Sequence, residues 1–128
     1  MIAALLLLAA APAAAEENCG DLPQQPMNAC FYQEFRRADA ELNAQWKVTS
    51  AALKAADREL DRDDRQPRYF PTALAAQRAW VIYRDQHCLG QSFDARGGTL
   101  QPTLDSTCKI SLTKARTAEL KDLADREP

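Results

Sequence analysis

The sequence offers few side chains that could act as catalysts. His87 is the single histidine in the chain of 128 residues, and it directly precedes Cys88. A nucleophilic Ser-His-Asp or Cys-His site would have to use this histidine. The sequence contains no GxSxG or HExxH motif, no glycine-rich phosphate loop and no EF-hand spacing. We therefore predict that the protein is not an enzyme and that it needs no cofactor.

The N-terminal segment is typical of an export signal. Residues 2–15 are apolar apart from Pro12, and the run ends on the small residues Ala13, Ala14 and Ala15. This run is shorter than the roughly 20 residues that a membrane-spanning helix needs. We predict a signal peptide at residues 1–15 and a mature domain at residues 16–128 that is periplasmic or secreted.

Cys19 could carry a lipid anchor only if small and apolar residues preceded it. Glu16, Glu17 and Asn18 stand there instead, so we expect no stable membrane anchor.

The charged side chains comprise 16 basic and 18 acidic residues, with a net charge of −2. Such a balance gives no general field for nucleic acid or for an anionic membrane, but it is compatible with a cationic protein partner.

The cysteines are the other residues with distinctive chemistry. An even number of cysteines in a small exported chain predicts disulfides rather than free thiols. A zinc site would need all four thiols in one cluster, and no CxxC pair is present, so we predict no metal site. The cysteines are Cys19, Cys30, Cys88 and Cys108.

Hydrophobic periodicity predicts helices throughout the mature chain. Between residues 27 and 60, apolar or small residues recur at steps of three and four, which is the pattern of one long amphipathic helix. We allow for a break near residues 48–50. The recurring residues are Met27, Phe31, Phe35, Ala38, Leu42, Trp46, Thr49, Leu53, Ala56 and Leu60.

Two further helices are predicted after the charged stretch that contains Pro67 and Pro71. Thr72 can cap a second helix that runs to about Leu89, and residues 91–101 read as a loop with a glycine turn. A third helix starts between residues 102 and 106. Its stripe consists of Leu112, Arg116, Leu120 and Leu123. The sequence therefore predicts an all-α fold, a three-helix antiparallel bundle with one long N-terminal helix.

In this bundle, Cys30, Cys88 and Cys108 lie at one end, and Cys19 is a short tail away. The spacing alone leaves the three possible pairings open. We favour Cys19–Cys30 and Cys88–Cys108, because both pairs close short local loops.

The stretch "AQRAWVIYRDQHC", residues 76–88, places an arginine on the face that also carries Cys88. We expect Trp80 and Tyr83 to pack on the first helix. A partly buried Arg84 needs a carboxylate, and we name Asp39 as its partner, with Asp85 as the alternative. This polar pair is interpreted as structural, in a helix held in the core; a ligand-binding polar cluster is the other interpretation.

Several of these motifs occur together in a known family. "MNAC…E…ADAELNAQW", "AQRAWVIYRDQHC", "GGT" and "C…LTKARTAEL" follow in this order. The set resembles the LprI-like family of small secreted bacterial proteins, which is named for a lysozyme-inhibiting member. The resemblance implies an exported helical domain with disulfides and, for some members, inhibition of lysozyme. The named inhibitor is a lipoprotein with an added C-terminal module, and this sequence departs from it in both respects.

A protein partner, such as a lysozyme, would have to meet an exposed surface. We select the loop at 91–101, in which Phe93 could supply an aromatic anchor. Asp94, or Asp105 after it, could face the cationic rim of a lysozyme cleft. The alternatives are a solvated connector and, for the whole protein, a structural or envelope-interaction role with another periplasmic partner. A small-molecule carrier is less favoured, because the helix stripes show no excess of small residues. The sequence does not indicate an oligomeric state.

Overall fold

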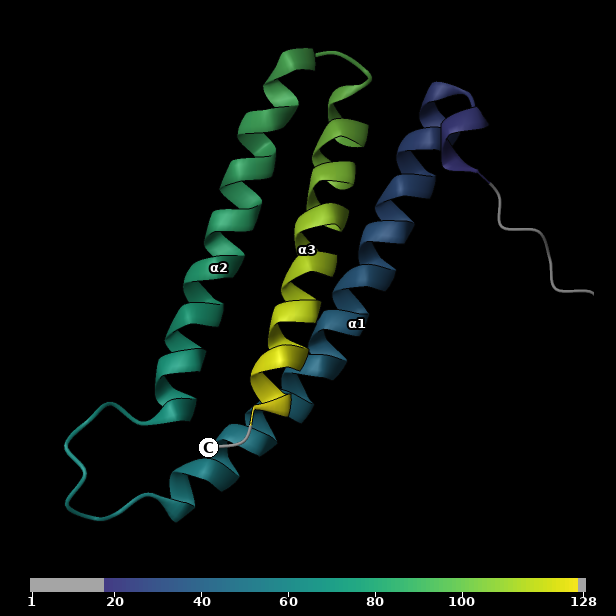
Figure 1. Ribbon diagram of the computed structural model, residues 1–128. Helices are drawn as coiled ribbons and strands as arrows, with labels where there is room; N and C mark the ends of the chain where they lie inside the picture. The colour runs from purple at the N-terminus through teal and green to yellow at the C-terminus, as the bar shows by residue number, and fades with distance from the viewer. Residues whose placement is uncertain (1–17, 127–128) are drawn as a thin grey trace, which may run out of the picture.

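A single long helix forms the N-terminal part of the computed structural model, which describes residues 18–126 (Figure 1). After a short 3-10 helix, η1 (Cys19–Asp21), α1 runs without interruption from Gln24 to Glu59. Every residue of the predicted stripe from Met27 to Leu60 is buried or half-buried. The residues chosen for the predicted signal peptide, 1–15, lie outside the described part of the chain.

The break that we allowed near residues 48–50 does not occur. Thr49 is fully buried, and its hydroxyl donates a hydrogen bond to the Leu120 carbonyl at 2.8 Å. The same hydroxyl accepts a hydrogen bond from Gln45 Nε2 at 3.2 Å. A β-branched residue is a weak helix former, but here its side chain ties α1 to another helix, so tertiary contacts override the local preference.

The second helix, α2 (Tyr69–Ser92), begins earlier than predicted. Thr72 does not cap it, because its hydroxyl donates to the Arg68 carbonyl within the first turn. The cap comes from α1, where the Asp57 carboxylate accepts hydrogen bonds from the backbone N–H groups of Tyr69 and Phe70 at 2.7 and 2.9 Å. Pro71 is tolerated in the first turn, because its missing N–H would have no helical partner there.

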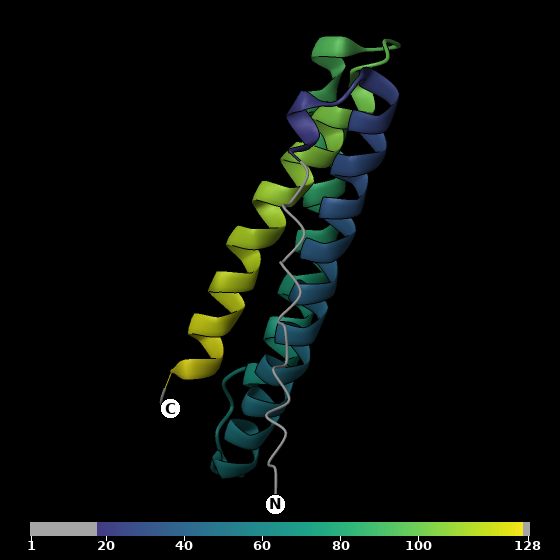
Figure 2. The same cartoon turned by 90° about the vertical axis from the view of Figure 1, so that its right-hand side faces the viewer.

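The third helix, α3 (Gln101–Asp125), packs most extensively against α1 and next against α2, whereas α1 and α2 contact each other least. In Figure 1, α1 and α3 run in the same direction and α2 runs opposite to both. Figure 2 shows α3 leaning away from the other two helices toward its C-terminal end. The predicted all-α three-helix bundle is confirmed. Within the described residues, no helix is long and apolar enough to cross a membrane.

Both disulfides that we favoured are present. Cys19 is bonded to Cys30, and Cys88 is bonded to Cys108. The first fixes η1 against the start of α1, and the second joins the end of α2 to the start of α3. Disulfides of this kind are typical of small proteins in oxidising compartments.

A buried arginine lies where the three helices meet. Arg84 of α2 is 6 % exposed. Its Nη1 donates to Asp39 Oδ1 of α1 at 2.8 Å, and its Nε donates to Asp85 Oδ1 at 2.9 Å. Nη1 also lies 3.4 Å from the Thr113 hydroxyl of α3. The structure thus pairs Arg84 with both carboxylates that the sequence suggested.

Aromatic rings cover the same guanidinium. Its carbon lies 5.1 Å from the centre of the Phe35 ring and 5.2 Å from that of the Trp80 ring. Two cations of α3 complete the stack, with Lys109 over Phe35 and Arg116 over Trp80. Such cation–π contacts are each worth about 0.5–2 kcal/mol, more when they are shielded from water.

Tyr83 does not pack on α1 as predicted. Its side chain is 55 % exposed, and its ring stacks on His87 at 5.2 Å. The reason is angular: Tyr83 is one position away from Arg84, and one step on a helix rotates a side chain by about 100°.

The Asp39–Arg84 pair should contribute more to stability than the Asp85–Arg84 pair, because the Asp39 side chain is less exposed and connects two helices. We expect Asp39→Asn to lower the free energy of unfolding by about 2 kcal/mol, the value of a charge-assisted hydrogen bond. Asp85→Asn should lower it by less than about 1 kcal/mol. Urea denaturation of the oxidised protein measures both. Equal losses in the two variants would contradict this ranking.

The Asp57 cap gives a second prediction. Asp57→Ala removes the acceptor for two N–H groups at the start of α2, and we expect a loss of about 1 kcal/mol. Asp63→Ala is the matched control, because Asp63 is exposed in the same connection and its carboxylate makes no hydrogen bond within the described residues. The midpoint of thermal unfolding should fall for the first variant only.

Candidate partner-binding surface

The segment that we predicted as a loop at residues 91–101 is mostly ordered helix and turn. Residues 91 and 92 complete α2, η2 (Phe93–Ala95) continues it as one 3-10 turn, and residue 101 already belongs to α3. The prediction of a loop was wrong at both ends. In this segment the Gln101 side chain accepts a hydrogen bond from the Gly97 N–H, and the Ser92 hydroxyl donates to the Leu89 carbonyl. A composition of polar residues and glycine does not distinguish such an ordered turn from a solvated loop.

The predicted glycine turn is where the chain reverses. Gly97 has a φ of +75°, a backbone conformation that residues other than glycine rarely adopt. A Cβ atom on Gly98 would lie 3.2 Å from the Ala95 carbonyl oxygen. Gln101 accepts a hydrogen bond from the Gly97 N–H at 2.9 Å, and the Thr99 carbonyl accepts one from Asn28 of α1. The turn is therefore held by both α1 and α3.

Phe93 and Asp94 project from this end of the bundle. Phe93 is 42 % exposed, and the Arg96 guanidinium lies 4.8 Å from its ring centre. Asp94 is exposed and makes no ion pair with any residue between 18 and 126. Both residues are thus accessible to a partner, on a segment whose backbone is fixed.

Asp105 lies in a different environment. Its Oδ2 accepts a hydrogen bond from Lys109 at 2.7 Å, and its Oδ1 is buried with no hydrogen-bond partner in the part of the chain that the structure describes. It lines a hollow next to Gly97 and Gly98 that shares no residue with the hollow beside Asp94. The structure therefore does not bring the two carboxylates together, and Asp94 is the one with an unpaired charge.

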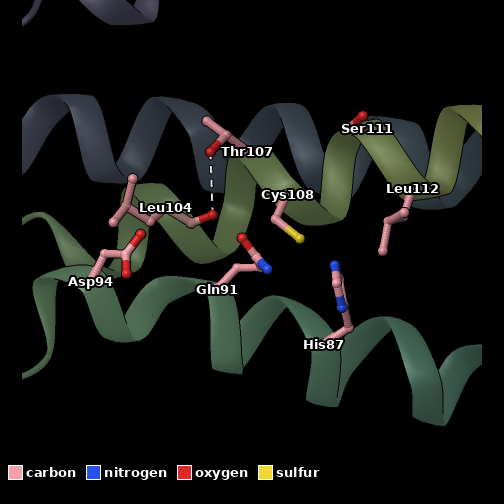
Figure 3. Close-up of a pocket in the computed structure, with 8 residues that line it drawn as sticks. All are labelled: His87, Gln91, Asp94, Leu104, Thr107, Cys108, Ser111 and Leu112. Atoms are coloured by element: carbon pink, nitrogen blue, oxygen red, sulfur yellow. Dashed lines mark hydrogen bonds between the residues drawn. The ribbon is translucent and has the colours of Figure 1, made fainter.

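The hollow beside Asp94 lies between α2 and α3 and has a volume of about 490 Å³. Figure 3 shows the side chains of His87, Gln91 and Asp94 reaching from α2 and η2 toward α3. Across from them, α3 supplies apolar atoms of the leucines and of the disulfide. The full lining is His87, Gln91, Asp94, Leu104, Thr107, Cys108, Ser111 and Leu112.

The outer face of α2 is a feature that the sequence analysis missed. Large apolar side chains are exposed there, on the side opposite to the buried Gln77, Arg84 and Cys88. The sequence does contain a signal for this face: Ile82 and Leu89 are seven residues apart and Phe93 follows four residues later, and residues at these spacings lie on one side of a helix. Exposed apolar groups gathered in this way mark interaction surfaces. They are Ile82, Leu89 and Phe93, with Tyr83 at the edge of this face.

A third hollow, of about 680 Å³, lies at the opposite end of the bundle, between the end of α1, the start of α2 and the end of α3. It is mainly apolar, and four alanines line it, which the search for small residues in the helix stripes did not detect. Its lining is Ala52, Leu53, Ala55, Ala56, Arg58, Glu59, Tyr69, Leu123, Ala124 and Arg126.

Comparison with known proteins agrees with these features. The model of the family "Lysozyme inhibitor LprI" matches residues 15–120. An uncharacterised protein, R02472 of Rhizobium meliloti (strain 1021), is 43 % identical over 126 residues, which cover 94 % of this chain and 91 % of that protein. No solved structure matches the chain significantly. With a match over most of its length, and with both disulfides and all three helices in place, the chain belongs to the LprI family of lysozyme inhibitors.

Proposed function

We propose that this protein is exported to the periplasm or beyond and inhibits a lysozyme by covering its substrate cleft. The observation that carries the proposal is the match to the LprI family over residues 15–120. The two disulfides support an oxidising compartment, and export by a signal peptide at residues 1–15 accounts for it.

Inhibition by occlusion requires only a rigid surface that is complementary to the cleft. The end of the bundle supplies the rigidity, because the Cys88–Cys108 disulfide and the Asn28–Thr99 hydrogen bond hold the segment that carries Phe93. A fixed segment loses little conformational entropy on binding. In this proposal the Phe93 ring is the apolar anchor and the Asp94 carboxylate faces the cationic rim of the cleft.

The exposed side chains of α2 extend this surface. Leu89 lies one helical turn before Phe93, and Ile82 lies two turns before Leu89 on the same side. A partner that contacts Phe93 would also cover these groups. We therefore propose that the interface continues along the outer face of α2 toward its N-terminus.

The direct test is turbidimetric lysis of bacterial cell walls by c-type and g-type lysozymes, with and without the oxidised protein. We expect dose-dependent inhibition of one type. If neither enzyme is inhibited at micromolar protein, this member of the family is not a lysozyme inhibitor. The alternative is then a structural or envelope partner, and a stable complex from periplasmic extract that contains no muramidase would identify it.

The double substitution Phe93→Ala with Asp94→Ala tests the surface. We expect the concentration for half-maximal inhibition to rise at least tenfold, which corresponds to about 1.4 kcal/mol. Tyr32→Ala with Glu41→Ala is the matched control, because it removes an exposed aromatic ring and an exposed carboxylate from α1. Circular dichroism should show unchanged helix content in both variants. Unchanged inhibition by the first variant would remove this segment from the interface.

A further inference from the structure

The hollow between α2 and α3 has two chemically different sides (Figure 3). The α3 side, the floor, consists of Leu104, Cys108 and Leu112 with the hydroxyl-bearing Thr107 and Ser111 among them, and the α2 side, the rim, consists of the polar His87, Gln91 and Asp94. Arginine and lysine side chains combine an apolar stem with a charged head. A hollow with a leucine-lined floor and one carboxylate at its rim has the complementary arrangement.

Between residues 18 and 126, no ion pair neutralises the charge at this rim. Asp94 has no ion-pair partner among the described residues, a state that it shares with other acids such as Glu41, and it is the only carboxylate among the residues that line this hollow. The C-terminus of a helix carries a partial negative charge that favours cations. The last turn of α2 contains no basic residue that would compensate it, so the helix end and the Asp94 carboxylate both contribute negative charge at the rim. Arg96, the basic residue that follows Asp94 in the chain, lies over the Phe93 ring.

The walls of the hollow are also fixed before a ligand arrives. The Cys88–Cys108 disulfide joins the two helices directly beneath it. The Thr107 hydroxyl donates within α3, to the carbonyls of Thr103 and Leu104, and therefore does not compete for the carboxylate. A preformed pocket binds a single side chain without ordering its own residues first.

We infer that this hollow is a receptor pocket for one cationic side chain, an arginine or a lysine, of the protein partner. The identity of that partner as a lysozyme rests on the proposed function, but the chemistry of the pocket does not. In the complex, the aliphatic stem lies on Leu104 and Leu112, and the cationic head reaches the Asp94 carboxylate. The pocket adds Gln91 and His87 to the contact surface beside Phe93.

The test uses free probes and the full oxidised protein. Nα-acetyl-argininamide is titrated into ¹⁵N-labelled protein while amide shifts are recorded by NMR, and Nα-acetyl-citrullinamide serves as the neutral probe of nearly the same shape. We expect saturable shifts at residues that line the hollow with the arginine probe, and at least fivefold weaker binding of the citrulline probe. Equal binding of both probes, or no saturable shift at tens of millimolar, would overturn the inference.

Two variants test separately the charge of Asp94 and the free volume of the hollow. Asp94→Asn keeps the shape and removes the charge, and Gln91→Phe keeps the charge and fills the hollow from an exposed position. Both should weaken arginine binding at least fivefold, whereas Glu41→Gln, an exposed acid on α1, should leave it unchanged. If Asp94→Asn and Gln91→Phe bind the probe as the unmodified protein does, the pocket assignment is wrong.

Lysozyme assays on the same variants distinguish this inference from the proposed function. Probe binding without inhibition of any lysozyme would retain the pocket and reject the lysozyme partner. Inhibition that is undiminished in Asp94→Asn and Gln91→Phe would retain the inhibitor and reject the pocket as part of its interface.

Discussion

The buried guanidinium of Arg84 is the constraint on which the arrangement of the helices depends. A charge removed from water costs several kcal/mol unless it is paired and hydrogen-bonded. Arg84 meets this condition only when Asp39 of α1, Thr113 of α3 and its own neighbour Asp85 stand at the positions observed. A shift of α1 by one turn, about 5.4 Å, would separate Arg84 from Asp39, and the same shift of α3 would separate it from Thr113. Only Asp85 of its own helix would then remain, so these contacts favour one relative register of the three helices.

The same helix serves two purposes on opposite faces. Its inner face holds Gln77, Arg84 and Cys88 in the core, and Gln77 accepts a hydrogen bond from Arg116 of α3. Its outer face leaves large apolar groups in solvent. Because the inner contacts make α2 rigid, the outer face and the turn after it are presented in one conformation, which suits a protein that acts by binding another protein.

Particular residues show which features of the fold and of the candidate site could be predicted from the sequence. The spacing of apolar residues along α1 predicted which side chains face the core, and short loop closure selected the correct cysteine pairs. Thr72 was wrongly assigned as a cap, because the cap of α2 is Asp57, which lies on another helix. The sequence predicted that Phe93 and Asp94 contact the partner. It did not predict that Leu104 and Leu112 of α3 line the hollow beside Asp94, because no local sequence pattern connects those leucines with Asp94.

The sequence by itself determined the helical class and the inward stripe of α1 and identified the family, and it favoured, among three pairings that it left open, the cysteine pairing that the structure has. These properties follow from the periodicity of neighbouring residues and from loop length, both of which are local. Only the tertiary structure decided that Arg84 meets both suggested carboxylates at once, which side of α2 stays uncovered and that Asp94 and Asp105 line separate hollows. These properties depend on how whole helices are rotated and inclined against one another, and packing between residues far apart in the chain sets those angles.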